Sequence, residues 1–433
     1  MLSGVLRMPS DKSIGHRAMI ANSVAAGAAT VHLAAPGADL FSTIACLQAL
    51  GIGVEVTRSS AGADVRIVGS PELPTGMRHL DCGNSGTTMR LLAGLMAARD
   101  GSTVLDGDAS LRRRPMERVA DPLRAMGASV TTSPDGCAPL RIDGRRPLRG
   151  MRHRLDVASA QLLATVVLAG LAADGDIEVE LPAPVRDHTE RLLAWMGASI
   201  GRIDERRTVL HAPATLTARS LAVPGDPSSA AAWMVAAAIR PGAEIRLVGL
   251  CVNPSRLALV DVLREMGAAI DVEQSEASAG KPEGPEPVGD VVVRGTGRLR
   301  PIQLAGARVA ALIDELPLLA IAMAAADGTS ELRGAGELRA KESDRIASVV
   351  TGLAAIGARV EELNDGWQVG AGRPVAAHIE THGDHRIAIA FAIAAAAGVG
   401  GDVLLDNADC VAVSYPTFWD DLAAASAATG ALA

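Results

Sequence analysis

Lysine is scarce in this chain: only three of its forty-one basic residues are lysines, and the others are arginines. Two of the three lie in short, densely charged segments, Lys12 within residues 10–17 and Lys341 within residues 340–345. An ammonium group is a compact point charge that can lose or share a proton, whereas a guanidinium stays charged. In a chain that otherwise uses arginine, the two lysines therefore indicate chemistry; chance retention at the surface is the alternative.

Aromatic residues are scarce too, at 2% of the chain, with one Tyr and three Phe. Stacking platforms for single-stranded nucleic acid need such side chains, so this class of binding is disfavoured. The net charge of −8 also argues against general binding to a phosphate backbone. We therefore expect no nucleic-acid partner.

Cysteines are few and scattered, five in number and never in a C-x-x-C pair. This usage fits a reducing compartment better than a disulfide framework or a zinc site. No apolar stretch of signal-peptide length opens the sequence. The longest apolar run, Val309 to Ala326, is interrupted by Asp314 and Glu315, so no membrane span is expected. These absences predict a cytoplasmic protein without membrane contact.

What the chain has in abundance is apolar residues, 48% of 433 positions, which is enough to bury more than one core and predicts two or three domains. One pattern recurs: an amphipathic helix with a Leu/Met register, then Gly, then a strand. Five copies at similar intervals favour a repeat of roughly 70 residues over chance helix–Gly–strand junctions. The five glycines are Gly51, Gly127, Gly197, Gly267 and Gly357, and the expected strands begin at Val54, Val130, Ile200, Ile270 and Val360.

A second helix of the repeat is apolar nearly all round and should be buried. Examples are expected over residues 161–172, 228–239, 312–326 and 387–397. The simplest architecture is α/β, with these helices inside and the strands and amphipathic helices around them. The segment Glu273 to Asp290, rich in Glu, Gly, Pro and Ser, is interpreted as an inserted loop, and residues 223–227 as a crossover near mid-chain.

Several segments could bind anions or move protons. The glycine-rich residues 81–90 run into an apolar helix expected at 91–98, and free backbone N–H groups there could face an anion, with an N-cap turn as the alternative. Arg112 to Arg114 form a basic run before another helix, a pattern that is more often a solvated face. Asp314 and Glu315 interrupt an apolar helix, where charges need a partner or a task.

Lys341 and Arg345 are spaced i,i+4, which predicts one helical face; a salt-bridge ladder is the structural alternative there. His382 and His385 lack a third metal ligand at suitable spacing, and Arg386 beside them favours an anion site at a helix start. Taken together, these motifs suit two phosphorylated or carboxylated substrates with a proton transfer between them. Residues as distant as Lys12 and Lys341 would meet only in a cleft between domains.

The chain resembles the enolpyruvyl transferase family, and within it the branch that acts on shikimate 3-phosphate, nearly end to end. The segments that carry the resemblance are residues 11–17, 83–87, 113–116, 159–161, 186–190, 225–230, 314–317, 338–345 and 384–386. The resemblance implies an inside-out α/β barrel fold with two domains of three βαβαββ units each. It places the N-terminal domain at residues 12–224 and the C-terminal domain at 1–11 plus 225–433, with the active site in the interdomain cleft.

The same resemblance implies a reaction of aromatic amino acid biosynthesis: the 5-hydroxyl of shikimate 3-phosphate attacks C2 of phosphoenolpyruvate, and phosphate leaves. It implies no metal and no organic cofactor, and a monomer whose partners are these two small molecules. In this family the herbicide glyphosate competes with phosphoenolpyruvate.

The residues that the resemblance assigns fall into three sets. Those around shikimate 3-phosphate are Lys12, Ser13, Arg17, Ser159, Ala160, Gln161, Arg186, Asp314 and Lys341. Those around phosphoenolpyruvate are Lys12, Gly86, Arg114, Gln161, Glu342, Arg345 and Arg386. The implied catalytic residues are Asp314, as the base for the hydroxyl, and Glu342 with Lys12, as proton donor and acceptor at the methylene carbon.

Three positions depart from relatives: Gly15 stands where many have Ser or Thr, and Leu163 and Val413 stand where some carry Lys. Other relatives also lack these two lysines, so their absence concerns affinity more than activity. Two alternatives remain open at this point. A UDP-N-acetylglucosamine enolpyruvyl transferase should carry a cysteine near Arg112 to Pro115, and this segment has none. A non-catalytic homologue would have no need for Lys12, Asp314, Lys341 and Glu342 together.

Overall fold

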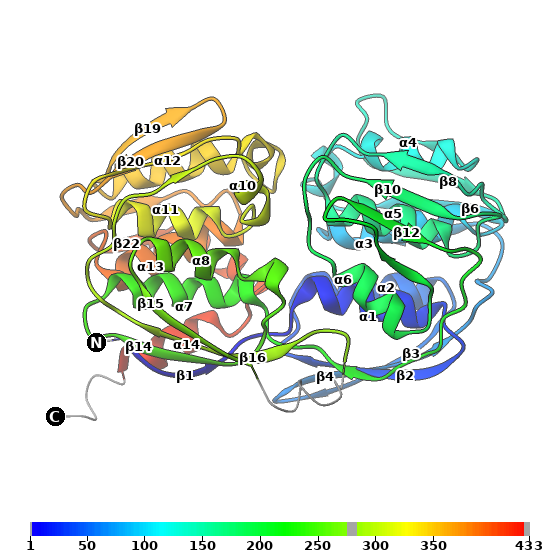
Figure 1. The fold of residues 1–433 in the computed structure, drawn as a ribbon, viewed down its shortest axis with the longest axis horizontal. Coiled ribbons are helices and arrows are strands. Elements are labelled where there is room, and N and C mark those ends of the chain that lie inside the picture. Colours follow the sequence, from blue (N-terminus) through cyan, green and yellow to red (C-terminus); the bar gives the residue numbers. More distant parts are fainter. Residues whose placement is uncertain (1, 275–283, 428–433) are drawn as a thin grey trace. The chain divides into compact units, whose positions relative to one another are not determined.

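The computed structural model describes residues 2–274 and 284–427, and the chain divides into two compact units. The N-terminal unit comprises Lys12–Val223 together with Glu283–Glu286. The C-terminal unit comprises Met1–Asp11, Pro224–Pro282 and Pro287–Ala433. Each unit is built from repeats of one α/β motif (Figure 1).

The N-terminal unit contains three buried helices, three outer helices and three sheets. Its elements are α1 (Lys12–Ser23), β2 (Gly27–Ala34), α2 (Ala38–Ala49), β3 (Gly53–Ser59), β4 (Gly62–Gly69), β5 (Arg78–Asp81), α3 (Gly86–Ala97), β6 (Gly101–Asp106), the short 3₁₀ helix η1 (Leu111–Arg113), α4 (Glu117–Ala125), β7 (Ser129–Thr131), β8 (Leu140–Gly144), β9 (Arg152–Arg154), α5 (Ala160–Gly170), β10 (Ile177–Glu180), α6 (His188–Trp195), β11 (Ile200–Arg202), β12 (Arg207–Leu210) and β13 (Leu221–Ala222).

The C-terminal unit follows the same plan. Its elements are β1 (Ser3–Arg7), α7 (Pro227–Ile239), β14 (Glu244–Cys251), η2 (Pro254–Arg256), α8 (Ala258–Glu265), β15 (Ala269–Gln274), β16 (Val288–Arg294), β17 (Gln303–Leu304), α10 (Ala307–Ala311), α11 (Leu316–Ala324), β18 (Thr329–Leu332), η3 (Gly336–Ala340), α12 (Arg345–Ala355), β19 (Arg359–Leu363), β20 (Gly366–Gly370), β21 (Ala377–Ile379), α13 (His385–Ala397), β22 (Val403–Leu405), η4 (Asp409–Val413) and α14 (Phe418–Ala427).

The sheets share one topology. In β5-β6-β8-β7, for example, the first pair is parallel and the next two pairs are antiparallel, and four other sheets have the same strand order. The parallel pair requires a crossover helix, which is the buried helix of the repeat. The sheet of the last repeat contains only β21 and β22 among the described residues. Two sheets take their first strand from far along the chain: β1 pairs with β14, and β13 pairs with β2.

The repeat glycines behave as the sequence predicts. Each follows an outer helix (α2, α4, α6, α8 and α12) and has a φ between 86° and 105°. A side chain with a Cβ is strained at such angles, so glycine allows the chain to turn from the helix into the next strand. The strands that follow begin within one residue of the expected positions.

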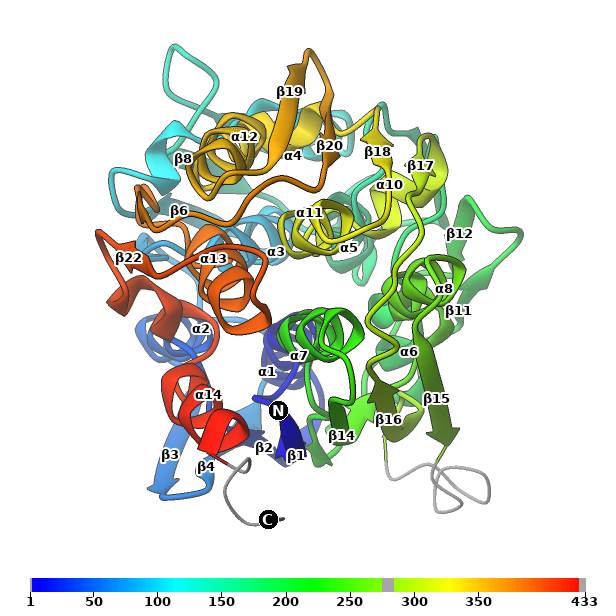
Figure 2. The same cartoon turned by 90° about the vertical axis from the view of Figure 1, so that its left-hand side faces the viewer.

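The apolar helices of the repeat are buried, as expected from their composition. In the C-terminal unit, α7, α11 and α13 contact one another, and Figure 2 shows them side by side with sheets around them. Trp233 and Phe391, on α7 and α13, are fully buried in this core. One boundary differs from expectation: α11 begins only at Leu316, so Asp314 and Glu315 precede the helix and do not interrupt it.

A close backbone approach between α3 and α5 supplies a first test. A Cβ built on Gly94 would lie 2.2 Å from the Thr165 backbone oxygen. Gly94→Ala should therefore lower the free energy of unfolding by about 1–3 kcal/mol, the usual cost of overpacking. Denaturant midpoints measure this, with Gly336→Ala as control because a Cβ at Gly336 meets nothing within 4 Å. An unchanged midpoint for Gly94→Ala would contradict the helix packing described here.

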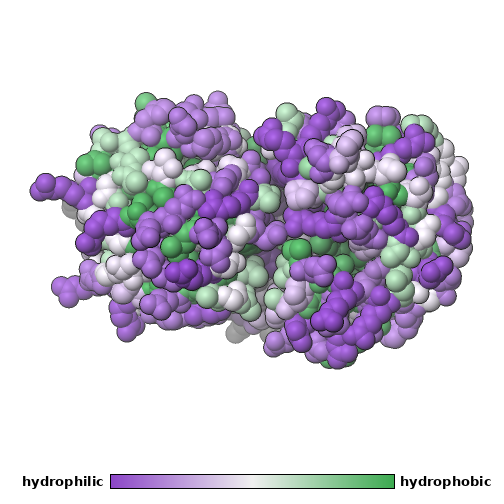
Figure 3. Space-filling model, turned by 90° about the horizontal axis from the view of Figure 1, so that it is seen from above, coloured by the Kyte–Doolittle hydropathy of each residue, from purple (hydrophilic) through white to green (hydrophobic). Residues whose placement is uncertain are grey.

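The face of the molecule drawn in Figure 3 is mostly hydrophilic, with small apolar patches on both units. Within residues 2–274 and 284–427, no helix combines the length and the hydrophobicity that a membrane crossing needs. The loop expected from Glu273 to Asp290 is shorter than predicted, because β15 extends to Gln274 and β16 begins at Val288. Residues 275–283 of that prediction lie outside the described residues.

Candidate active site

In the N-terminal unit, the starts of all three buried helices come together. The buried Arg17 on α1 connects this helix to α5 and to the outer helix α6: its Nη2 donates to the Ala160 carbonyl at the start of α5 at 3.1 Å, and its Nε donates to Thr189 Oγ1 of α6 at 2.8 Å. Its Nη1 donates to the Ser13 carbonyl at 3.0 Å. Arg17 thus joins residues 13, 160 and 189, which are far apart in the sequence.

The start of α3 joins the same place through Gln161 on α5. Arg90 Nη1 donates to Gln161 Oε1 at 2.6 Å, and Gln161 Nε2 donates to Thr87 Oγ1 at 2.9 Å. Ser159 is the N-cap of α5, because its side chain accepts from the Leu162 N–H. A serine at this position satisfies a helix N–H that would otherwise lack a partner.

Two guanidinium groups border Gly86, the first residue of α3. A Cβ built there would lie 3.0 Å from Arg90 Nη1 and 3.2 Å from Arg114 Nη1. Arg114 is buried, and its Nη2 donates to Asn84 Oδ1 at 2.6 Å. The basic run is therefore not simply a solvated face: Arg112 and Arg113 are exposed, but Arg114 points into the protein.

Lys12 is the first residue of α1. Its Nζ donates to Asp39 Oδ2 in the first turn of α2 at 3.1 Å, and the two side chains are 22% and 13% exposed. A partly exposed ammonium with a carboxylate partner is held in place while its charge stays accessible to a ligand. Arg186 is half-buried and lies two residues before α6, the helix that carries Thr189.

The arrangement of the N-terminal unit suits an anion. Three helix N-termini each present the positive end of a helix dipole and free N–H groups. Lys12, Arg17, Arg90 and Arg114 add full positive charges at the same helix starts or bonded to them.

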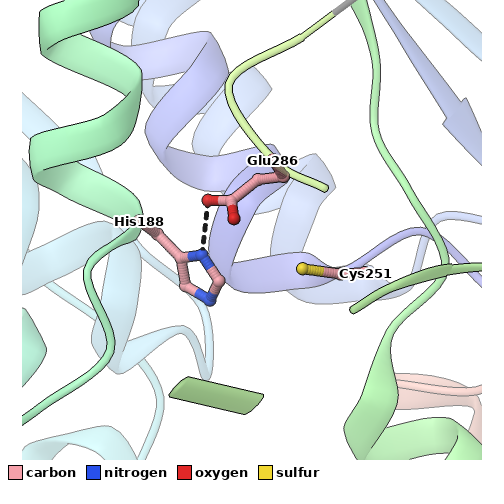
Figure 4. Close-up of side chains that lie close together, drawn as sticks. All are labelled: His188, Cys251 and Glu286. Carbon is pink, nitrogen blue, oxygen red and sulfur yellow. Dashed lines mark hydrogen bonds and ion pairs between the residues drawn. The ribbon is translucent and has the colours of Figure 1, made fainter. Parts of the chain in front are cut away.

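A buried histidine–glutamate hydrogen bond lies next to this group. His188, the first residue of α6, shares a hydrogen bond of 2.7 Å between its Nδ1 and Glu286 Oε1, and both side chains are 2% exposed (Figure 4). Cys251, which the figure also labels, belongs to the C-terminal unit. Glu286 follows β15 in the chain but belongs to the N-terminal unit. Its hydrogen bond to His188 therefore holds the start of α6, which lies two residues after Arg186.

In the C-terminal unit, a second set of charges surrounds Arg345 at the start of α12. Its Nε donates to Asp384 Oδ2 at 2.8 Å, its Nη2 donates to Glu342 Oε2 at 2.7 Å, and its Nη1 lies 4.0 Å from Asp314 Oδ1. Burial alone would raise the pKa of Asp384, but the charge and the hydrogen bond of Arg345 together lower that pKa. Burial likewise opposes the charge of Arg345, and Asp384 and Glu342 more than compensate, so the pKa of Arg345 is raised.

Lys341 corrects one prediction. It does not share a helical face with Arg345, because it lies in extended backbone after η3 and α12 begins only at Arg345. Lys341 Nζ instead lies 3.7 Å from Asp314 Oδ1. An ammonium therefore lies beside the carboxylate that the resemblance assigns as the base.

The residues His382, His385 and Arg386 lie at or just before the start of α13. Asp384 caps α13 by accepting from the Arg386 N–H, His385 and Arg386 are buried, and His382 is exposed. The Arg386 charge also acts on Asp226, the N-cap residue of α7. The starts of α7 and α13 thus meet, and Ser228 on α7 donates to Glu315 at the start of α11, so three helix starts meet in this unit as in the other.

Some residues of these groups are absent from the assigned sets. They include Asp39, Asn84, Thr87, Arg90 and Asp384. Arg90 and Asn84 could have been found, since both lie in the glycine-rich segment whose charge the sequence already shows. Asp39 carried no signal, because an acidic residue in a first helical turn is ordinary.

The structure shows what surrounds the three positions at which the sequence departs from relatives. A Cβ on Gly15 would lie 2.9 Å from Leu40 Cδ2, so glycine here permits close packing of α1 on α2. Leu163 is buried on α5, and Val413 is half-buried at the end of η4. A lysine at position 163 would need space for its charge that the apolar core does not provide.

Two units of repeated α/β motifs with buried helices define the enolpyruvyl transferase class of fold. The enolpyruvyl transferase NikO from Streptomyces tendae has this fold, with a TM-score of 0.73 at 18% identity, covering 98% of this chain and 94% of that one. EPSP synthase from Acinetobacter baumannii is more similar, with a TM-score of 0.82 at 36% identity over 98% and 96% of the two chains.

The sequence narrows the class to one family. The model of the family EPSP synthase (3-phosphoshikimate 1-carboxyvinyltransferase) matches residues 1–422. A protein of Roseiflexus sp. (strain RS-1) named 3-phosphoshikimate 1-carboxyvinyltransferase is 47% identical over 98% of this chain and 96% of its own. One of that name from Synechococcus sp. (strain WH7803) is 44% identical over 98% and 95%. The chain belongs to the EPSP synthase family.

Proposed function

We propose that this protein transfers the enolpyruvyl group of phosphoenolpyruvate to the 5-hydroxyl of shikimate 3-phosphate and releases phosphate. The observation that carries the proposal is the group around Asp314 in the C-terminal unit, where Lys341 and Arg345 lie within 4.0 Å of its carboxylate. A hydroxyl nucleophile needs a positioned base, and family membership supplies the two substrates.

The proposed chemistry proceeds in two stages. In the addition stage, Asp314 takes the proton of the attacking hydroxyl, and the hydroxyl oxygen bonds to C2 of phosphoenolpyruvate. A proton from Glu342 or Lys12 reaches the methylene carbon. In elimination, a proton leaves the resulting methyl group, the C–O bond to phosphate breaks, and the carbon–carbon double bond is restored. Clustered cations favour both stages because they hold two anions together and stabilise negative charge at the transition state.

The substrate-binding roles remain those that the sequence suggests, divided between the units. The residues proposed for shikimate 3-phosphate are Lys12, Ser13, Arg17, Ser159, Ala160, Gln161, Arg186, Asp314 and Lys341, and those for phosphoenolpyruvate are Lys12, Gly86, Arg114, Gln161, Glu342, Arg345 and Arg386. The chemistry requires both sets around one pair of substrates, so the proposal includes an interdomain cleft between residues 12–224 and the remainder. We also propose that the protein is a cytoplasmic monomer that acts without a cofactor.

Phosphate release tests the function directly. Release should require shikimate 3-phosphate and phosphoenolpyruvate together, and the organic product should be the 5-enolpyruvyl ether. Asp314→Asn should reduce the rate by at least ~10²-fold, the scale of one general base, and serves to exclude a contaminating enzyme. Release with UDP-N-acetylglucosamine as acceptor, or with neither acceptor, would overturn the proposal.

A further inference from the structure

The C-terminal unit contains a buried charge cluster that none of the assigned sets includes. Arg256, at the end of η2, donates from Nη1 to Asp11 Oδ2 at 2.5 Å and from Nη2 to Asp226 Oδ1 at 2.8 Å. The exposed fractions of these three side chains are 1%, 0% and 8%. One guanidinium thus bridges two carboxylates that are far apart in the sequence.

Both carboxylates lie where the chain passes between the units. Asp11 immediately precedes Lys12, where the N-terminal unit begins, and Asp226 follows Val223, where it ends. The two connecting segments also pair through their backbones: the Asp11 N–H donates to the Pro224 carbonyl and the Asp226 N–H donates to the Pro9 carbonyl, both at 2.8 Å. Arg256 therefore fixes the side chains of two segments that the backbone already holds together.

The cluster also reaches the helix that follows the expected base. Arg256 Nη2 donates to Ser228 Oγ at 2.9 Å, and Ser228 Oγ donates to Glu315, the residue after Asp314. Glu315 is the N-cap residue of α11. Through one serine, Arg256 is therefore connected to the backbone from which Asp314 extends.

The charges explain why an arginine is needed here. Burial and the Asp11 charge raise the pKa of Asp226, so the two acids repel each other in the absence of a cation. Burial disfavours charge on Arg256, but Asp11 and Asp226 outweigh it and raise its pKa. The planar fork of a guanidinium can serve two carboxylates and a hydroxyl at once, whereas an ammonium offers no such fixed geometry. Replacing a buried ion pair or triad by well-packed apolar residues of similar volume is often neutral for stability, so we look for a second role of this cluster.

We propose that Arg256 is a positioning residue for the reaction: it fixes the segments that carry Lys12 and Asp314 without touching either substrate. This inference rests on the proposed function, because it assigns those two residues their chemical roles. Its effect is on the placement of reacting groups, and misplacement by about 1 Å can reduce a rate by ~10²-fold.

Two variants test it. Arg256→Lys retains a positive charge opposite Asp11 and Asp226 but loses the fork. The triple variant Arg256→Met, Asp11→Asn, Asp226→Asn removes all three charges with little change in volume, and asparagine still caps α7. Arg308→Met is the control, since Arg308 forms an exposed ion pair with Glu265. For each variant, kcat, both KM values and the melting temperature are measured, with hydrogen exchange at the Asp11 and Asp226 amides.

We expect both variants to lose at least ~10²-fold in kcat, while KM for either substrate changes by less than ~10-fold, because the binding groups remain. The triple variant should melt within a few degrees of the wild type, and exchange at Asp11 and Asp226 should accelerate while exchange in α13 does not. A wild-type kcat in the triple variant would overturn the proposal. So would a kcat that returns to the wild-type value in whichever variant keeps the wild-type melting temperature, because the loss would then reflect stability alone. A wild type without phosphate release would instead overturn the proposed function, so the two failures are distinguishable.

Discussion

Lys12→Arg should retain the fold and lose at least ~10²-fold in turnover, the usual scale for one catalytic group. An arginine at position 12 can still pair with Asp39, whose carboxylate lies 3.1 Å from the lysine Nζ, so the start of α1 should form as before. What the variant loses is a group that can give up or accept a proton, because a guanidinium remains protonated.

The test of Lys12 compares kcat with the melting temperature. Arg308→Lys is the matched control, since it makes the reverse exchange at an exposed ion pair and should change neither quantity. Turnover close to that of the wild type would show that Lys12 supplies charge alone. The inference from its rarity in the sequence would then be wrong.

Gly86→Ala should weaken glyphosate inhibition much more than it weakens phosphoenolpyruvate binding, and the wild type should be glyphosate-sensitive. The added methyl would lie 3.0 Å from Arg90 Nη1 and 3.2 Å from Arg114 Nη1, the two guanidinium groups at the start of α3. Both belong to flexible side chains, so they can shift by a few tenths of an ångström. The shift reduces the space beside the bound anion, and the larger competitor should lose more affinity.

Inhibition constants and the KM for phosphoenolpyruvate, measured in both proteins, decide this prediction. Gly201→Ala in β11 is the control, because a Cβ there meets nothing within 4 Å. The alternative that Gly86 serves only a left-handed turn is disfavoured, since its φ does not lie in that region, whereas that of Gly83 does. Equal losses for both ligands would leave only a general disturbance of the loop.

The repeat was the most predictable part of the fold. Continuous apolar composition locates α5, α7 and α13 to within two residues, because a helix that is apolar all round can only be buried. Glycine after each outer helix located the turns, since that residue alone tolerates the φ found there. Asp314 was placed inside a helix because composition does not show where a helix begins when the residues before it are apolar as well.

The residues of the site are easier to predict from the sequence than the contacts between those residues. The spacing of Lys341 and Arg345 suggests a helical face, yet Lys341 is extended and α12 begins only at Arg345, so tertiary pairing with Asp314 takes the place of a local ladder. The Arg256 cluster could not be predicted at all. It joins Asp11 to Asp226 across most of the N-terminal unit's sequence, and no local pattern reports a contact of that separation.

The pairing of β1 with β14 has a consequence for synthesis on the ribosome. Ser3 pairs with Glu244, so the first strand of the C-terminal unit is made long before its partner exists. At typical translation speeds that delay is roughly 10–50 s, during which the whole segment Lys12–Val223 emerges and can close its own sheets. We therefore expect the N-terminal unit to fold first. During this time β1 has no partner strand, and chaperones can bind its exposed backbone groups.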